Sequence, residues 1–221
     1  MSLFPIFSPV ARVTTLSLFG SATAFGPTVT APASILAGDF MILADYAYNN
    51  DNLPTNVVPS GFTQIVTTGF EPADGARVTT SYKIATGSEG STSITGMNNE
   101  SEGKCLYVFR GNAPITSVSV STPNAQGTGG DPTAQSVLAG SGTPPLIVFG
   151  VYYCSTTDGQ NPLTPRSFSP AKDGEISNTT VQQLYLAYKI YNSSPQNTSI
   201  DMTDFPPAGI NTLQSFYASM S

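Results

Sequence analysis

Histidine and tryptophan are both absent from the 221 residues of this sequence. Histidine is the usual general base near neutral pH and the commonest metal ligand. Its absence excludes Ser-His-Asp and Cys-His catalytic sites, and also zinc sites built on histidine. C-x-x-C pairs and the glycine-rich loops that bind nucleotides are missing as well. The sequence therefore predicts that the protein is not an enzyme and that it holds no cofactor and no metal ion.

Charge is also scarce, because charged residues make up only 10% of the chain and the net charge is −6. The eight Lys and Arg residues are scattered, whereas a nucleic-acid-binding protein needs a clustered basic face. No apolar run approaches the roughly 18–20 residues that span a bilayer. The first residues are not typical of a signal peptide, because Pro5, Pro9 and Arg12 interrupt the apolar stretch. We expect neither a nucleic acid nor a membrane as partner.

Cysteine occurs only twice, as Cys105 and Cys154, and each lies inside an apolar strand pattern. The pattern predicts two buried thiols. A disulfide would require that the two strands be neighbours.

Small polar residues and turn formers are abundant. Ser and Thr together number 53, about a quarter of the chain, and there are 20 Gly and 18 Pro. β-Branched Thr favours strands, Gly and Pro favour tight turns, and no long amphipathic run of helical period occurs. The composition predicts an all-β protein.

Two segments, 40–48 and 146–154, are apolar on both faces, as the central strands of a packed sandwich are. The segment 181–191 alternates instead, which predicts an inner face of Leu184, Leu186 and Tyr188 and an outward face on the other side. Residues 124–133 are the most linker-like stretch. The remaining strands are expected at residues 11–19, 27–31, 62–68, 77–85, 91–96, 104–110, 115–121, 135–139, 198–202 and 212–218.

The sequence indicates an internal duplication. "YKIATGSEGSTSI" (Tyr82–Ile94) and "YKIYNSSPQNTSI" (Tyr188–Ile200) begin and end alike, 106 residues apart. At the same offset, segment 40–48 falls on 146–154, with Tyr46 over Tyr152. Neither half could bury an apolar sheet face alone. We therefore predict one jelly-roll-like β-sandwich over residues 11–221, built from halves of about 11–117 and 118–221. Two independent small domains are the alternative.

Carboxylates could still hydrolyse glycosides as a pair, so their places matter. Most lie in loops beside Gly or Asn, where they are typical of solvated or turn-capping residues. Asp45 differs because it lies in the middle of a strand. It is expected either to pair with a Lys or Arg of a neighbouring strand or to face solvent, and a catalytic role is the less favoured interpretation. No catalytic residue is therefore assigned.

Four motifs in order resemble a known family. They are a "P-x-x-[apolar]-x-x-G-D-[apolar]" strand (Pro32–Phe40), a "P-x-G-[aromatic]-T" turn (Pro59–Thr63), a "Y-K-I-A-x-G-S-E" hairpin (Tyr82–Glu89), and Phe109-Arg110-Gly111 in place of "Y-R-G". In these the chain resembles the jelly-roll-like β-sandwich structural proteins of tailed bacteriophages and prophages. The resemblance implies a virion protein of the capsid-decoration or head- or tail-fibre type. It brings no catalytic residues.

The first ten residues, "MSLFPIFSPV", form a separate predicted element. Phe4, Ile6, Phe7 and Val10 are too apolar for a free tail, and the prolines favour an extended segment. The segment is either an edge strand of its own sandwich or an arm that packs on a neighbouring subunit.

From the resemblance, we expect a virion structural protein that decorates or cements the capsid or forms a short head or tail appendage. Its partners would be other capsid or tail proteins and further copies of itself, with a trimer as one arrangement that covers sheet edges. The alternatives are a tail fibre and a secreted carbohydrate-binding module. A module that binds host glycan would need an exposed row of tyrosines.

Overall fold

The computed structural model describes residues 12–49, 51–70, 75–98, 101–128, 135–138, 142–155, 168–169, 171–179, 182–193, 199–202 and 210–221. These residues form antiparallel strands and loops without a helix, so the predicted all-β class is confirmed. The predicted apolar arm with Phe4, Ile6, Phe7 and Val10 lies outside the described residues.

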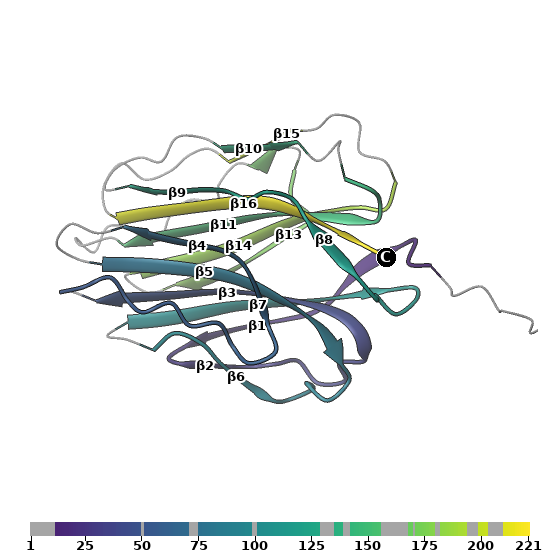
Figure 1. Ribbon diagram of the computed structural model, residues 1–221, viewed down its shortest axis with the longest axis horizontal. Coiled ribbons are helices and arrows are strands. Elements are labelled where there is room, and N and C mark those ends of the chain that lie inside the picture. The colour runs from purple at the N-terminus through teal and green to yellow at the C-terminus, as the bar shows by residue number, and fades with distance from the viewer. Residues whose placement is uncertain are drawn as a thin grey trace, which may run out of the picture.

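The first half of the chain forms a five-stranded antiparallel sheet, here called the first sheet (Figure 1). A short outer pair of strands, β2 (Thr28–Thr30) and β6 (Ser93–Thr95), covers its outer face through Val29 and Ile94. The strand order of the first sheet is β1 (Leu16–Phe25), β7 (Ser101–Gly111), β3 (Ala37–Asn49), β5 (Gly75–Thr86), β4 (Thr63–Phe70).

The second half forms the second sheet, again antiparallel. A small outer sheet accompanies it, made of β10 (Gln135–Leu138), β15 (Ser199–Met202) and β12 (Phe168–Ser169). The order of the second sheet is β13 (Gly174–Thr179), β14 (Gln182–Tyr191), β11 (Leu146–Ser155), β16 (Ile210–Met220), β8 (Val118–Val120), and β9 (Asn124–Thr128) also pairs with β16.

Four layers are visible in Figure 1: the two large sheets lie face to face, and one short set of strands lies outside each. The core between the large sheets is aromatic. Phe149 of the second sheet contacts Phe40 and Phe109 of the first, with ring centroids 6.3 and 5.8 Å apart. Tyr188 meets Phe109 edge to face at 5.0 Å. Both faces of the central strands β3 and β11 are covered. This explains why their sequences are apolar throughout and do not alternate between apolar and polar residues.

The strand order of one sheet recurs in the other. β1-β7-β3-β5-β4 in the first sheet matches β9-β16-β11-β14-β13 in the second. The outer pair β2–β6, nested in sequence inside β1–β7, likewise matches β10–β15. This nested pairing is a feature of jelly-roll-like folds. Segments 40–48 and 146–154 thus hold the same place in both sheets, whereas the common origin of the halves stays a prediction.

The predicted correspondence of Tyr46 with Tyr152 is wrong by one residue. Tyr46 points between the large sheets, where its ring lies 4.8 Å from that of Tyr153. Tyr152 points to the opposite face and packs near Tyr185. Because side chains alternate along a strand, a shift of one residue exchanges the inner and outer faces. Tyr46 lies four residues after the ladder partner of Tyr82, and Tyr153 lies four residues after the ladder partner of Tyr188, so Tyr153 is the structural counterpart of Tyr46.

Three other expectations fail at sheet edges and outer faces. Residues 124–128 of the predicted linker form β9, and the strand expected at 11–19 instead spans Leu16–Phe25. The second face of β14 was expected to be exposed, yet Gln183, Tyr185 and Ala187 are buried. A two-layer sandwich would leave this face in solvent, whereas the second half has a further layer of strands, in which β10 contacts β16 and β9.

Candidate functional site

The motifs that carry the family resemblance meet at one end of the first sheet, where β3 and β4 begin and β5 and β7 end. Asp39 of the "G-D" motif and Arg110 of the "F-R-G" motif form an ion pair. Arg110 Nε donates to Asp39 Oδ1 at 2.8 Å, and Arg110 Nη2 donates to Oδ2 at 2.6 Å. The backbone N–H of Leu36 also donates to Asp39 Oδ2, at 2.8 Å. This bidentate pair joins the start of β3 to the end of β7.

Arg110 has two further contacts. Its Nη2 donates to the carbonyl of Ser34 at 2.9 Å, and its guanidinium lies 3.9 Å from the ring centre of Phe19. The hydrogen bond to Asp39 raises the pKa of Arg110 above its ordinary value, although burial opposes the shift. Arg110 therefore links β1, the Ser34 turn and β3 as a permanently charged donor.

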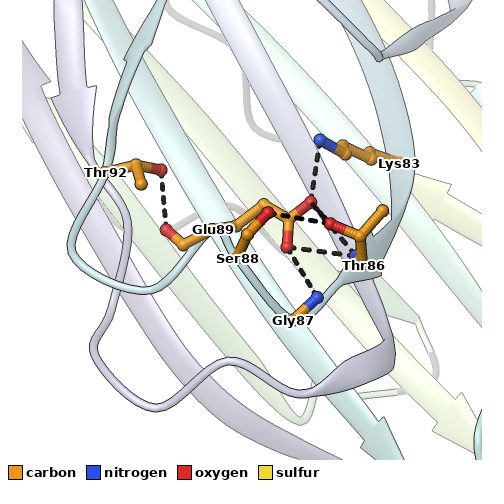
Figure 2. Close-up of polar contacts among 6 residues, drawn as sticks. All are labelled: Lys83, Thr86, Gly87, Ser88, Glu89 and Thr92. Atoms are coloured by element: carbon orange, nitrogen blue, oxygen red, sulfur yellow. Dashed lines mark hydrogen bonds and ion pairs between the residues drawn. The ribbon is translucent and has the colours of Figure 1, made fainter.

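Glu89 organises the turn after β5, as Figure 2 shows. Its buried carboxylate accepts hydrogen bonds from the backbone N–H groups of Thr86 at 3.1 Å and Gly87 at 2.9 Å. It also accepts one from the Thr86 hydroxyl at 2.9 Å and contacts Lys83 Nζ at 2.8 Å. The carbonyl of Glu89 accepts from the hydroxyl of Thr92 at 2.7 Å. The turn-capping role expected for the loop acids is what Glu89 performs.

Burial alone would raise the pKa of Glu89, but the hydrogen bonds from Lys83 and Thr86 outweigh it and lower the pKa to about 2. A carboxyl with a depressed pKa stabilises the folded state above its unfolded pKa, and this contribution is lost as the pH falls through the folded value.

We expect Glu89→Gln to cost up to about 3 kcal/mol of unfolding free energy at pH 7. The gap between wild type and variant should shrink as the pH falls from about 4.5 to about 2. Urea unfolding at pH 7, 4 and 2 measures it, and the comparison cancels the other carboxyls. Glu175→Gln is the matched control, because its pair with Lys172 is more exposed. An equal gap at all three pH values would contradict the assignment.

The Glu89 turn docks on the segment that leads into β3. Ser91 N–H donates to the carbonyl of Pro32 at 3.3 Å. Gly90 lies so close to this segment that an added Cβ would stand 3.2 Å from the nitrogen of Ser34. Gly61 of the "P-x-G-[aromatic]-T" turn lies against the Lys83 ammonium, at the same Cβ distance of 3.2 Å. All four motifs thus form one polar cluster, the motif cluster, whose contacts join loops to strand ends.

Asp45 forms an ion pair with Lys104 of the neighbouring strand β7, which selects the first of the two structural alternatives. Lys104 Nζ lies 2.9 Å from Asp45 Oδ1, and the two side chains are 0% and 2% exposed. Burial raises the pKa of Asp45 to about 6, although the charge of Lys104 opposes the shift. A substrate dissolved in water does not reach this pair.

The ionised groups of the described residues are used mainly within the fold. Five ion pairs involve Asp39, Asp45, Glu89, Asp173 and Glu175. In the described part of the chain, no cluster of three or more carboxylates or thiols is arranged to hold a metal ion. Cys105 and Cys154 are buried, as predicted, and no disulfide joins them. They lie on strands of different sheets.

No protein-family model, curated protein or solved structure matches the chain. The likeness to phage proteins therefore rests on the four motifs. None of the described segments is a helix able to cross a membrane.

Proposed function

We propose that this chain is a non-enzymatic structural protein of a tailed-bacteriophage virion, most simply a capsid decoration or cement protein or a short head or tail appendage. The proposal rests on one observation, that the charged residues of the motifs have a structural role. Asp39, Arg110, Lys83 and Glu89 hold strand ends and turns together. A family defined by such motifs shares a scaffold rather than a reaction, which suits a protein that acts through contacts with other proteins.

The surface supports a role in assembly. Charged residues are few, and several of them are turned into the fold by the ion pairs. Large apolar side chains are exposed on the first half, since Leu18, Phe25, Leu36 and Val57 are each 40–55% accessible. A weakly charged surface with apolar side chains is suited to repeated contacts between subunits. The proposed partners are copies of this chain and neighbouring capsid or tail proteins.

A tail fibre uses the same contact chemistry and stays a second candidate. The burial of the tyrosines is evidence against a carbohydrate-binding module. All ten lie within the described residues, and each is buried or partly buried, so they form no exposed row. Sugar binding by stacking needs exposed aromatic faces, and the one large exposed aromatic among the described residues is Phe25.

Deleting residues 2–10 tests the proposed role of the apolar arm. We expect the melting temperature of the monomer to stay within a few degrees while oligomers and particle binding are lost, because the arm would bury its side chains on a neighbouring subunit. Native mass spectrometry and differential scanning calorimetry measure the two effects. Replacing Phe4, Ile6, Phe7 and Val10 by serine keeps the length and should act alike. Loss of folding would assign the segment to its own sandwich, and unchanged assembly would overturn the arm.

A further inference from the structure

The Asp45–Lys104 pair has features that an ordinary ion pair does not require. The two residues are directly opposite each other on the central strands β3 and β7. Both side chains are almost completely removed from water, with the Lys104 nitrogen 2.9 Å from a carboxylate oxygen. In such surroundings the energy of the charged pair approaches that of the neutral amine and acid, because desolvation disfavours both charges.

The backbone of Met97 holds both partners. Its N–H donates to Asp45 Oδ2 at 2.7 Å, and its carbonyl accepts from Lys104 Nζ at 3.0 Å. Gly96 lies against Asp45 so closely that no side chain fits between them. A secondary amide makes two hydrogen bonds of this kind. Its oxygen accepts one from an N–H group, and its own N–H donates one to a carbonyl. The pocket therefore complements an amide between the two side chains as well as it complements the ion pair.

We propose that Lys104 and Asp45 condense in the folded protein to an isopeptide bond between Nζ and Cγ. A proton passes from the ammonium to Asp45 Oδ1, which leaves a neutral amine beside a neutral acid. Nζ attacks Cγ while the N–H of Met97 stabilises the negative charge that develops on Oδ2. A proton from nitrogen then moves to Oδ1, the C–O bond breaks, and one water leaves. The reaction joins an amine and a carboxyl and needs neither oxidant nor cofactor.

The proposal assigns to Glu102 the transfer of the proton between nitrogen and oxygen. It lies two residues from Lys104 on β7, so both side chains occupy the same face of the strand, and its charge acts on Asp45. A carboxyl that accepts and returns a proton lowers the barrier of such a condensation. The fold also raises the rate because it holds the amine and the carboxyl at a short, fixed distance, so the two groups do not have to meet by diffusion.

The test is the mass of the intact wild-type protein, followed by tryptic mapping. We expect a mass lower than the sequence mass by one water, and a branched peptide that joins residues 13–77 to residues 84–110 with Lys104 uncut. Lys104→Arg is the matched control, because arginine keeps the positive charge but is a poor nucleophile; its mass should equal the mass of its sequence. Glu102→Gln should lower the cross-linked fraction by about tenfold or more after equal times.

Two outcomes would overturn the proposal, and a third would overturn the role of Glu102 within it. A wild-type mass equal to the sequence mass, with normal cleavage after Lys104, excludes the bond. Loss of water that persists in Lys104→Arg assigns the change to a succinimide at an Asp-Gly pair, such as Asp173-Gly174, and also excludes it. A fully cross-linked Glu102→Gln variant removes the role of Glu102.

Discussion

Replacing Phe149 with alanine should lower the free energy of unfolding by about 3–5 kcal/mol, because it removes the ring at the centre of the contact between the two large sheets. Phe149 is fully buried and contacts Phe40 and Phe109 across the sheets and Phe216 beside it. The three rings cannot close the space, because each is fixed on a separate strand. Equilibrium unfolding in guanidinium chloride measures the loss.

Phe25→Ala is the matched control. It deletes the same atoms from β1 at a side chain that is 52% exposed, so we expect a change within about 0.5 kcal/mol. Equal effects of the two substitutions would mean that the sheets do not pack through Phe149.

Gly38→Ala should destabilise the protein by about 2–5 kcal/mol, from two causes that add. Gly38 has a φ of 86°, which an L-residue adopts at a cost. Its added Cβ would also stand 2.6 Å from Pro114 Cβ and 2.7 Å from Pro114 Cα. The backbone at this crossing cannot move freely, because Ile115 N–H donates to the carbonyl of Gly38. The same shift would displace Asp39 and weaken its pair with Arg110.

Gly26→Ala separates the two causes. Gly26 has a similar φ of 96°, but its Cβ would meet nothing within 4 Å. We expect about 1–2 kcal/mol there, the cost of the backbone conformation alone. Thermal unfolding of both variants measures the difference. If the Gly38 variant lost no more stability than the Gly26 variant, Pro114 would have moved aside to make room for the added Cβ.

The central part of the fold could be predicted because its signal is local. Segments 40–48 and 146–154 are apolar on both faces, and only a strand covered on both sides suits such a sequence. β9 and β13 could not be found in this way. Their sequences, "NAQGT" and "GEISNT", are mostly polar, and they become strands by pairing with β16 and β14. Edge strands of this kind depend on tertiary context more than on propensity.

The candidate site could likewise be predicted only where its signal is local. The position of Asp45 inside an apolar strand predicts a charged partner, yet the sequence does not say which of eight basic residues it is. The pair Asp39–Arg110 joins residues 71 positions apart, so only the fold brings them together. Glu89 carried a local signal, since a carboxylate that follows "T-G-S" can reach back to the N–H groups of Thr86 and Gly87.

The proposed function is tested most directly by cryo-electron microscopy of phage particles purified from the source of this chain, supported by mass spectrometry of their proteins. We expect the chain in many copies per particle, with density for the two large sheets at symmetry-related positions on the capsid or a short appendage. Absence of the chain from purified particles, together with its recovery as a secreted monomer, would contradict a role in the virion.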